Sequence, residues 1–177
     1  MSYFLVISGS PSKFSRNSFL LAGLERRLEA YETTLRTAHA NELQPFAPDA
    51  SQRLADLINT VHNARAILLV TPVPSEEWTG CMKTLLQFLP AGSFRHRPVV
   101  LIGTSGSMDE LPDLERSLHR ELTRLNGHLA LSSIHVGPKN WVFSDSQPPW
   151  LTVGTELRLN RALEQLYSLS VEVVATT

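Results

Sequence analysis

Short apolar runs alternate with segments of helical periodicity along almost the whole chain of 177 residues. The run Ala66–Val70 contains only apolar side chains, which is typical of a strand that is covered on both faces. The segment before it, 50–63, carries its apolar residues at helical spacing. Strands that alternate with helices predict a parallel sheet with helices on both faces. The expected strands are 3–8, 33–37, 66–70, 98–103 and 129–136, and the expected helices are 17–30, 50–63, 79–89, 111–125 and 156–173.

Five strands in a chain of this length suit an α/β three-layer sandwich of the flavodoxin-like kind, with a five-stranded parallel sheet in the order 2-1-3-4-5. We expect one domain over residues 1–177, because no linker, repeat or low-complexity tract divides the chain. In such a sheet, ligands bind beyond the carboxyl ends of the strands, where the strand order reverses. Three loops are therefore expected to meet at one crevice, namely 8–17, 71–80 and 103–108. The stretch 137–152 is predicted to be irregular.

The turn after the first expected strand is rich in hydroxyl groups. Residues 8–18 read Ser-Gly-Ser-Pro-Ser-Lys-Phe-Ser-Arg-Asn-Ser and lead into an expected helix. Backbone N–H groups and the helix dipole favour an anion at a helix N-terminus, and Lys13 and Arg16 add positive charge, so the turn suits a phosphate group. Serine, glycine and proline are also ordinary turn residues, and Ser15 or Asn17 would cap a helix without any ligand. The residues alone leave both interpretations open.

The composition argues against several classes of protein. A net charge of −1 gives no sign of binding to nucleic acid or to an anionic membrane. The apolar runs are too short for a membrane span, and the first residues lack the pattern of a signal segment. The single cysteine, Cys81, excludes an internal disulfide framework. We therefore expect a cytoplasmic protein with neither a membrane nor a nucleic-acid partner.

The sequence also lacks the common motifs of side-chain catalysis. Gly9 is not followed by the glycines of a dinucleotide fingerprint, and no Gly-Lys-Ser/Thr sequence completes a nucleotide P-loop. Residues 103–107 miss the Gly-x-Ser-x-Gly motif of esterases, because serine stands at the last position. The six histidines are scattered without metal-like spacing. This pattern predicts no catalytic side chain and no metal site, and it favours chemistry performed by a bound cofactor.

Four segments carry a resemblance that covers nearly the whole chain. The most specific is Thr-Pro-Val at 71–73, followed by Gly-x-x-Lys-Thr-Leu-Leu at 80–86. The other three are Gly9-Ser10-Pro11 with Ser15-Arg16-Asn17, the segment Leu43–Pro48, and Thr104-Ser105-Gly106-Ser107. Together they resemble the NADPH-dependent FMN reductases of the flavodoxin-like superfamily, especially the alkanesulfonate-type reductases that supply reduced flavin to a partner monooxygenase.

The resemblance implies where FMN would bind. Ser10, Ser15 and Asn17 would donate hydrogen bonds to the FMN phosphate, and Arg16 would supply positive charge. The loops after the third and fourth strands would meet the edge and the pyrimidine side of the flavin ring. The cofactor-binding residues implied in this way are Ser8, Ser10, Ser15, Arg16, Asn17, Ser18, Thr71, Pro72, Val73, Pro74, Ser105, Gly106 and Ser107.

The resemblance further implies an NAD(P)H-dependent FMN reductase, which transfers a hydride from NADPH or NADH to N5 of the flavin. Reduced flavin or its electrons would pass to free flavin, a quinone or a partner flavin-dependent monooxygenase. Pro74 and the pair Glu76-Glu77 depart from the family pattern, and they keep an alternative open. In that alternative the chain is a non-catalytic flavodoxin-like binding or subunit protein with weak or lost FMN binding. A flavodoxin-type electron carrier is disfavoured, because such carriers are usually strongly acidic.

The resemblance also implies a homo-oligomer, either a homodimer or a homotetramer. Aromatic residues are frequent at such interfaces, and the candidates are Trp78, Phe88, Trp141 and Trp150. The same side chains would serve equally well as anchors of the core or of a loop.

Overall fold

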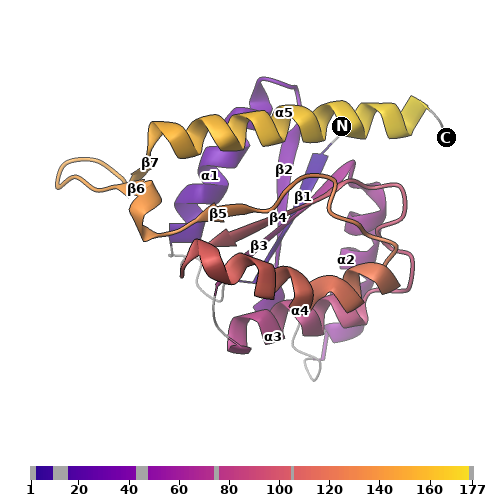
Figure 1. Cartoon of the computed structure of the whole chain (residues 1–177). Coiled ribbons are helices and arrows are strands. Elements are labelled where there is room, and N and C mark those ends of the chain that lie inside the picture. Colours follow the sequence, from indigo (N-terminus) through magenta and orange to yellow (C-terminus); the bar gives the residue numbers. More distant parts are fainter. Residues whose placement is uncertain (1–2, 10–15, 43–47, 74–75, 105, 176–177) are drawn as a thin grey trace.

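A computed structural model describes residues 3–9, 16–42, 48–73, 76–104 and 106–175. Five parallel strands form one sheet in the order β2-β1-β3-β4-β5 (Figure 1). The predicted flavodoxin-like fold class and strand order are thus confirmed. The strands are β1 (Tyr3–Ser8), β2 (Thr34–His39), β3 (Ala66–Pro72), β4 (Val99–Thr104) and β5 (Ile134–Val136), and the main helices are α1 (Arg16–Glu29), α2 (Ala50–Asn63), α3 (Glu76–Phe88), α4 (Leu111–Arg124) and α5 (Val153–Ala175).

Helices cover both faces of the sheet. Helices α1 and α5 lie on one face, and α2, α3 and α4 lie on the other (Figure 1). Successive side chains of a strand point to opposite faces, so Phe4 and Val6 pack under α1 and α5 while Leu5 and Ile7 pack against the other layer. Every residue of β1 and β4 is buried. This explains why the central strands are almost continuously apolar in sequence.

The register of the sheet brings three strand ends to the same level. Ser8 at the end of β1 is paired with Val70 of β3, and Pro72 at the end of β3 is paired with Thr104 of β4. The backbone continues this pairing into the loops, where the amide of Gly9 donates to the carbonyl of Val70 over 2.8 Å. The loops that leave β1, β3 and β4 therefore start at one edge of the sheet, as the sequence predicts.

Three predicted boundaries are wrong by three residues or more, and one of them is the start of α5, which was expected at 156 and lies at Val153. The last strand was expected over 129–136 but covers only Ile134–Val136, with one isolated bridge between Leu129 and Val99. Leu129 and Leu131 are apolar because they pack against the two core layers, and this burial does not require strand pairing. Helix α3 begins at Glu76, three residues before the predicted start at 79. The pair Glu76-Glu77 therefore belongs to the first turn of a helix, where the helix dipole favours negative charge.

The segment 137–152 is more regular than predicted. It contains a short helical turn, Pro138–Asn140, and an antiparallel pair of strands, β6 (Trp141–Val142) and β7 (Trp150–Leu151). Asn140 fixes this segment, because its Oδ1 accepts from the amide of Gly137 and its Nδ2 donates to Oγ1 of Thr155. The backbone carbonyl of Asn140 also accepts from the amide of Thr152. One side chain thus ties the end of β5 to the start of α5.

An exposed ion pair lies at the start of α2. Nε of Arg53 donates to Oδ2 of Asp49 over 2.7 Å, and this hydrogen bond lowers the pKa of the Asp49 carboxyl below its ordinary value. A lowered pKa in the folded state means that the pair stabilises the fold at neutral pH and that this contribution is lost as the pH falls through the lowered pKa. Both groups are exposed to solvent, so the contribution is small.

Among the described ranges, none of the helices combines the length and the apolar character that a membrane crossing requires.

Candidate functional site

The candidate site lies beyond the carboxyl ends of β1, β3 and β4. Ser8 and Thr71, at two of these strand ends, are completely buried. The structure brings together the described members of the predicted set, since the strand pairs align their positions and α1 begins next to the end of β1. The described members are Ser8, Asn17, Ser18, Thr71, Pro72, Val73, Gly106 and Ser107, and Arg16 is described only as the first residue of α1. Ser10, Ser15, Pro74 and Ser105 lie outside the described residues, as does most of the resembling segment Leu43–Pro48.

The first loop leaves β1 in close contact with β3. A Cβ atom at Gly9 would lie 2.6 Å from Oγ1 of Thr71 and 3.4 Å from Cε of Met82. Real Cβ atoms do not approach an oxygen so closely, so only glycine allows the backbone to follow this path. The glycine therefore sets where the hydroxyl-rich turn begins relative to the end of β3.

The second and third loops are held against each other. The amide of Val73 donates to the carbonyl of Thr104 over 2.6 Å. Gly106 has a φ of 63°, and a Cβ atom there would lie 2.0 Å from the carbonyl oxygen of Val73. Glycine is thus required at position 106 both by its backbone conformation and by the space available. The two loops are therefore packed directly against each other, backbone against backbone.

A fourth segment, which the sequence reasoning did not include, also reaches the loop that contains Gly106. A Cβ atom at Gly137, just after β5, would lie 3.3 Å from the carbonyl oxygen of Gly106 and 2.3 Å from the ring of His135. The signal in the sequence is the run Gly-Pro-Lys-Asn, whose asparagine holds the turn. The segment that follows β5 therefore lies beside the loop that contains Gly106.

Ser107 has a local role in addition to the predicted contact with the flavin. Its hydroxyl accepts from the amide of Asp109 over 3.3 Å, and its own amide donates to Oε2 of Glu110 over 2.8 Å. This reciprocal arrangement is a capping box that starts the short helical turn Met108–Glu110. The capping box fixes the far end of the loop that contains Gly106.

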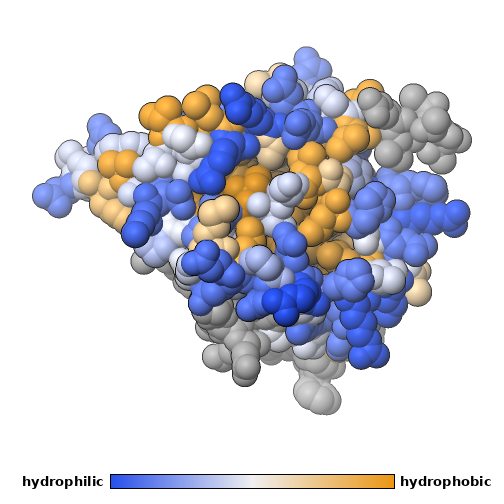
Figure 2. Space-filling model, in the orientation of Figure 1, coloured by the Kyte–Doolittle hydropathy of each residue, from blue (hydrophilic) through white to orange (hydrophobic). Residues whose placement is uncertain are grey.

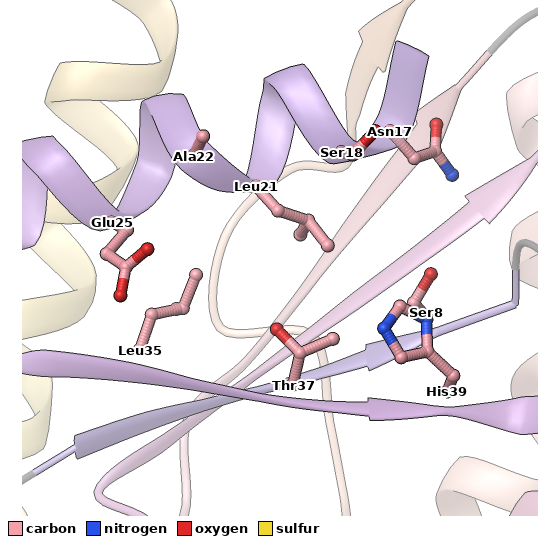
Figure 3. Close-up of a pocket in the computed structure, with 9 residues that line it drawn as sticks. All are labelled: Ser8, Asn17, Ser18, Leu21, Ala22, Glu25, Leu35, Thr37 and His39. Carbon is pink, nitrogen blue, oxygen red and sulfur yellow. The ribbon is translucent and has the colours of Figure 1, made fainter. Parts of the chain in front are cut away.

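Asn17 in the first turn of α1 carries an unsatisfied hydrogen-bonding group. Only 7% of the residue is exposed, and its Nδ2 has no hydrogen-bond partner among the described residues. Leaving a buried donor unpaired costs about 1–3 kcal/mol. Asn17 lines a cavity of about 360 Å³ between α1 and β2, and Figure 3 shows α1 facing β2 across it. The cavity is lined by Ser8, Asn17, Ser18, Leu21, Ala22, Glu25, Leu35, Thr37 and His39.

The residues present fit an FMN group. Oγ1 of Thr71 is buried and, like Nδ2 of Asn17, finds no partner in the described part of the chain. One orphaned group lies at the N-terminus of α1, where a phosphate is favoured, and the other lies at the end of β3. Gly9 and Gly106 allow the backbone to pass close to β3 and to Val73, where a Cβ atom would clash. FMN matches this arrangement, because its phosphate would lie at the N-terminus of α1 and its flat ring would lie near the end of β3.

The described residues hold no group of three or more histidine, cysteine, aspartate or glutamate side chains that would bind a metal. Cys81 is a free, partly buried thiol that packs against the core.

Of the aromatic candidates for an interface, Trp141 is buried in the core, whereas Phe88 and Trp150 are exposed. The side chain of Trp78 lies outside the description.

The fold is similar to that of several solved structures. An oxidoreductase from Corynebacterium diphtheriae is 20% identical and superposes with a TM-score of 0.75, covering 97% of this chain and 98% of that protein. The apo form of the NADH:FMN oxidoreductase EmoB is 22% identical, with a TM-score of 0.76. The match covers 94% of this chain and 89% of EmoB. FerB from Paracoccus denitrificans, an NAD(P)H:acceptor oxidoreductase, is 18% identical and superposes with a TM-score of 0.74. The match covers 97% of this chain and 98% of FerB.

The sequence comparisons define the family. The family described as NADPH-dependent FMN reductase matches residues 3–140. The FMN reductase (NADPH) of Escherichia coli (strain K12) is 26% identical, covering 92% of this chain and 87% of the relative. The FMN reductase (NADPH) of Pseudomonas putida (strain KT2440) is 28% identical, covering 91% of this chain and 84% of the relative. The chain belongs to the NADPH-dependent FMN reductase family, which confirms the predictions of an oxidoreductase, of FMN as its cofactor and of NADPH as the reductant.

Proposed function

We propose that this chain reduces FMN with NADPH in the crevice beyond β1, β3 and β4. The observation that carries the assignment of the site is the buried amide of Asn17 at the start of α1, which has no partner in the described ranges of the chain. When bound, FMN supplies the ring that accepts the hydride. The protein's task is to position two rings against each other, and this positioning needs no acid or base from the chain.

The described residues divide into two groups by what they would hold. The N-terminus of α1 and the amide of Asn17 would bind the FMN phosphate, together with the sequence-predicted Ser10, Ser15 and Arg16. Thr71, Pro72 and Val73 would border the ring on one side. Gly106 and Ser107 would border it on the other, because the backbone of this loop packs directly on that of Val73. The close packing of the two loops would exclude water beneath the ring.

The proposal also covers the electron acceptor, the cellular location and the extent of the domain. Reduced flavin or its electrons would pass to free flavin, a quinone or a partner flavin-dependent monooxygenase. The unpaired cysteine suits a cytoplasmic location, where thiols stay reduced. The range 1–177 would act as one domain, because the sheet takes its five strands from both halves of the chain.

Replacing Asn17 tests the phosphate end of the site. Asn17→Ala is expected to weaken FMN binding by about tenfold, because it removes a charge-assisted hydrogen bond worth about 1.5 kcal/mol. The free energy of unfolding without FMN is expected to stay constant or rise, because a buried unpaired donor disappears. Flavin fluorescence titration and urea unfolding measure the two effects.

Asn59→Ala is the matched control, because Asn59 is an exposed asparagine on α2. It should leave FMN affinity unchanged. If Asn17→Ala bound FMN as tightly as the native chain, the phosphate would have to lie elsewhere.

A self-associating surface would explain the exposed apolar side chains around β6 and β7. Trp150 is 41% exposed, and Val153 and Leu157 on the first turns of α5 are 74% and 51% exposed. These side chains lie on or beside the hairpin, which projects from the body of the molecule (Figure 1). Exposed apolar groups gathered in this way mark interaction sites, and we infer that they contact a second copy of the chain.

Light scattering tests this interface. The native chain is expected to be a dimer or tetramer, and Leu157→Glu is expected to shift it toward monomer, because a carboxylate would be buried in the contact. Gln52→Glu on α2 should change nothing. A native monomer at tens of micromolar would contradict the proposed interface.

A further inference from the structure

A second concave surface lies on the other side of the loop that contains Gly106. A groove of about 500 Å³ runs between β5 and α5, with Met108 at one end. Strand β5 pairs only with β4 and forms the edge of the sheet, so its outer side faces this groove. Figure 2 shows apolar side chains gathered on this face, with hydrophilic ones around them. The groove is lined by Met108, Ala130, Leu131, Ser132, Ser133, Ile134, His135, Arg158, Arg161, Ala162 and Gln165.

Two arginines supply the charge that lines the groove. Arg158 and Arg161 lie three residues apart on α5, so they share one side of the helix. Nη2 of Arg158 donates to Oγ1 of Thr155 over 3.3 Å. Neither arginine forms a salt bridge within the described part of the chain. The lining includes no aspartate or glutamate, so the groove is suited to an anion and unsuited to a cation.

The groove lies beside the loop of the proposed flavin site. Met108 lies two residues after Gly106, and His135 in the middle of β5 has its ring close to Gly137. Gly137 in turn approaches the carbonyl oxygen of Gly106. The loop that would border the flavin ring on one side therefore borders the groove on the other. A ligand longer than the crevice would pass over this loop and enter the groove.

The surfaces within the groove match a nucleotide. Leu131 and Ala162 supply an apolar surface on which a base would lie, and Ser132 and Gln165 supply exposed polar groups beside it. Two guanidinium groups that form no salt bridge with a described residue suit a phosphate, which arginine binds through paired hydrogen bonds. A volume of about 500 Å³ falls within the range of small-molecule sites.

We propose that this groove binds the adenosine 2′-phosphate half of NADPH, an inference that rests on the proposed function. Arg158 and Arg161 hold the 2′-phosphate, and the apolar floor supports the adenine. The nicotinamide half then lies over the loop at Gly106, next to the flavin. The two arginines thereby determine the preference for NADPH over NADH.

Direct binding tests the groove without requiring flavin reduction. Calorimetric titration with adenosine 2′,5′-bisphosphate is expected to show binding at least about tenfold tighter than that of adenosine 5′-monophosphate, because a second phosphate meets the arginines. The double variant Arg158→Ala/Arg161→Ala is expected to lose this preference. Arg116→Ala/Arg120→Ala on α4 removes the same charge from an exposed helix and should keep it. Equal affinity of the native protein for the two nucleotides would overturn the proposal.

Steady-state kinetics with both reductants supply the second readout. In the Arg158→Ala/Arg161→Ala variant, KM for NADPH is expected to rise by about tenfold or more, while KM for NADH and the affinity for FMN change by less than about twofold. Equal rises for NADPH and NADH would overturn the assignment of the 2′-phosphate. If FMN did not bind but the bisphosphate bound through the two arginines, the groove would stand and the proposed function would fail.

Discussion

Gly106→Ala is expected to weaken FMN binding by about 100-fold. A residue other than glycine at a φ of 63° costs about 1–2 kcal/mol, and the added methyl group would lie 2.0 Å from the carbonyl oxygen of Val73. The loop must move away from Val73 to relieve this contact, and the wall that would border the flavin ring moves with it. A combined cost of about 3 kcal/mol corresponds to about 100-fold in affinity. Flavin fluorescence titration measures the effect.

Gly154→Ala separates this effect from that of removing any glycine. A Cβ atom at Gly154, in the first turn of α5, meets no atom within 4 Å, so FMN affinity should stay unchanged. Circular dichroism of the Gly106→Ala protein should show a native sheet, because the change is confined to a surface loop. Native FMN affinity in the Gly106→Ala variant would show that this loop does not border the flavin.

Arg124→Ala is expected to lower the free energy of unfolding by about 2–3 kcal/mol, with little effect on FMN affinity. Arg124 at the end of α4 donates to the backbone carbonyls of Leu89 and Leu86 over 2.8 and 2.5 Å, respectively, which joins it to the end of α3. It also lies 3.5 Å from the carboxylate of Glu121, whose side chain is only 8% exposed. Removing the guanidinium leaves a nearly buried charge without its cation. Urea unfolding monitored by tryptophan fluorescence measures the loss.

A matched variant on the same helix is Arg116→Ala. Arg116 pairs with Asp113, but both side chains are mostly exposed, so its removal should cost less than about 0.5 kcal/mol. If the Arg124→Ala and Arg116→Ala variants had the same free energy of unfolding, the burial of Glu121 would not explain how Arg124 stabilises the fold.

Much of the fold could be predicted because burial leaves a direct mark on the sequence. The runs in β1, β3 and β4 are apolar at nearly every position, since both faces of these strands are covered. Strand β5 was placed too early because Leu129 and Leu131 are apolar for a different reason. They pack against the two core layers, although only Leu129 makes a bridge, an isolated one to Val99. The pattern of apolar residues indicates which side chains are buried, but it does not indicate which backbone groups form hydrogen bonds between strands.

The site could be predicted in part. Its three loops follow from strand order, because parallel strands place their carboxyl ends at one edge. The contribution of Gly137 could not be predicted, since it depends on how Asn140 bonds to Thr155 across the start of α5. Nor could the two interpretations of Asn17 be separated by sequence, because caps and ligand contacts use the same residue types. The amide of Asn17 is buried and has no partner among the described residues, and on this observation we base the proposed ligand contact.

The measurement that tests the account most directly is a titration of the purified protein with FMN, followed by NADPH oxidation at saturating flavin. We expect dissociation in the micromolar range, since a few charge-assisted hydrogen bonds offset the cost of association, and we expect NADPH to be consumed only when FMN is present. Both properties should weaken together in Gly106→Ala. A native chain that binds no FMN would contradict the account and would favour a non-catalytic flavodoxin-like protein.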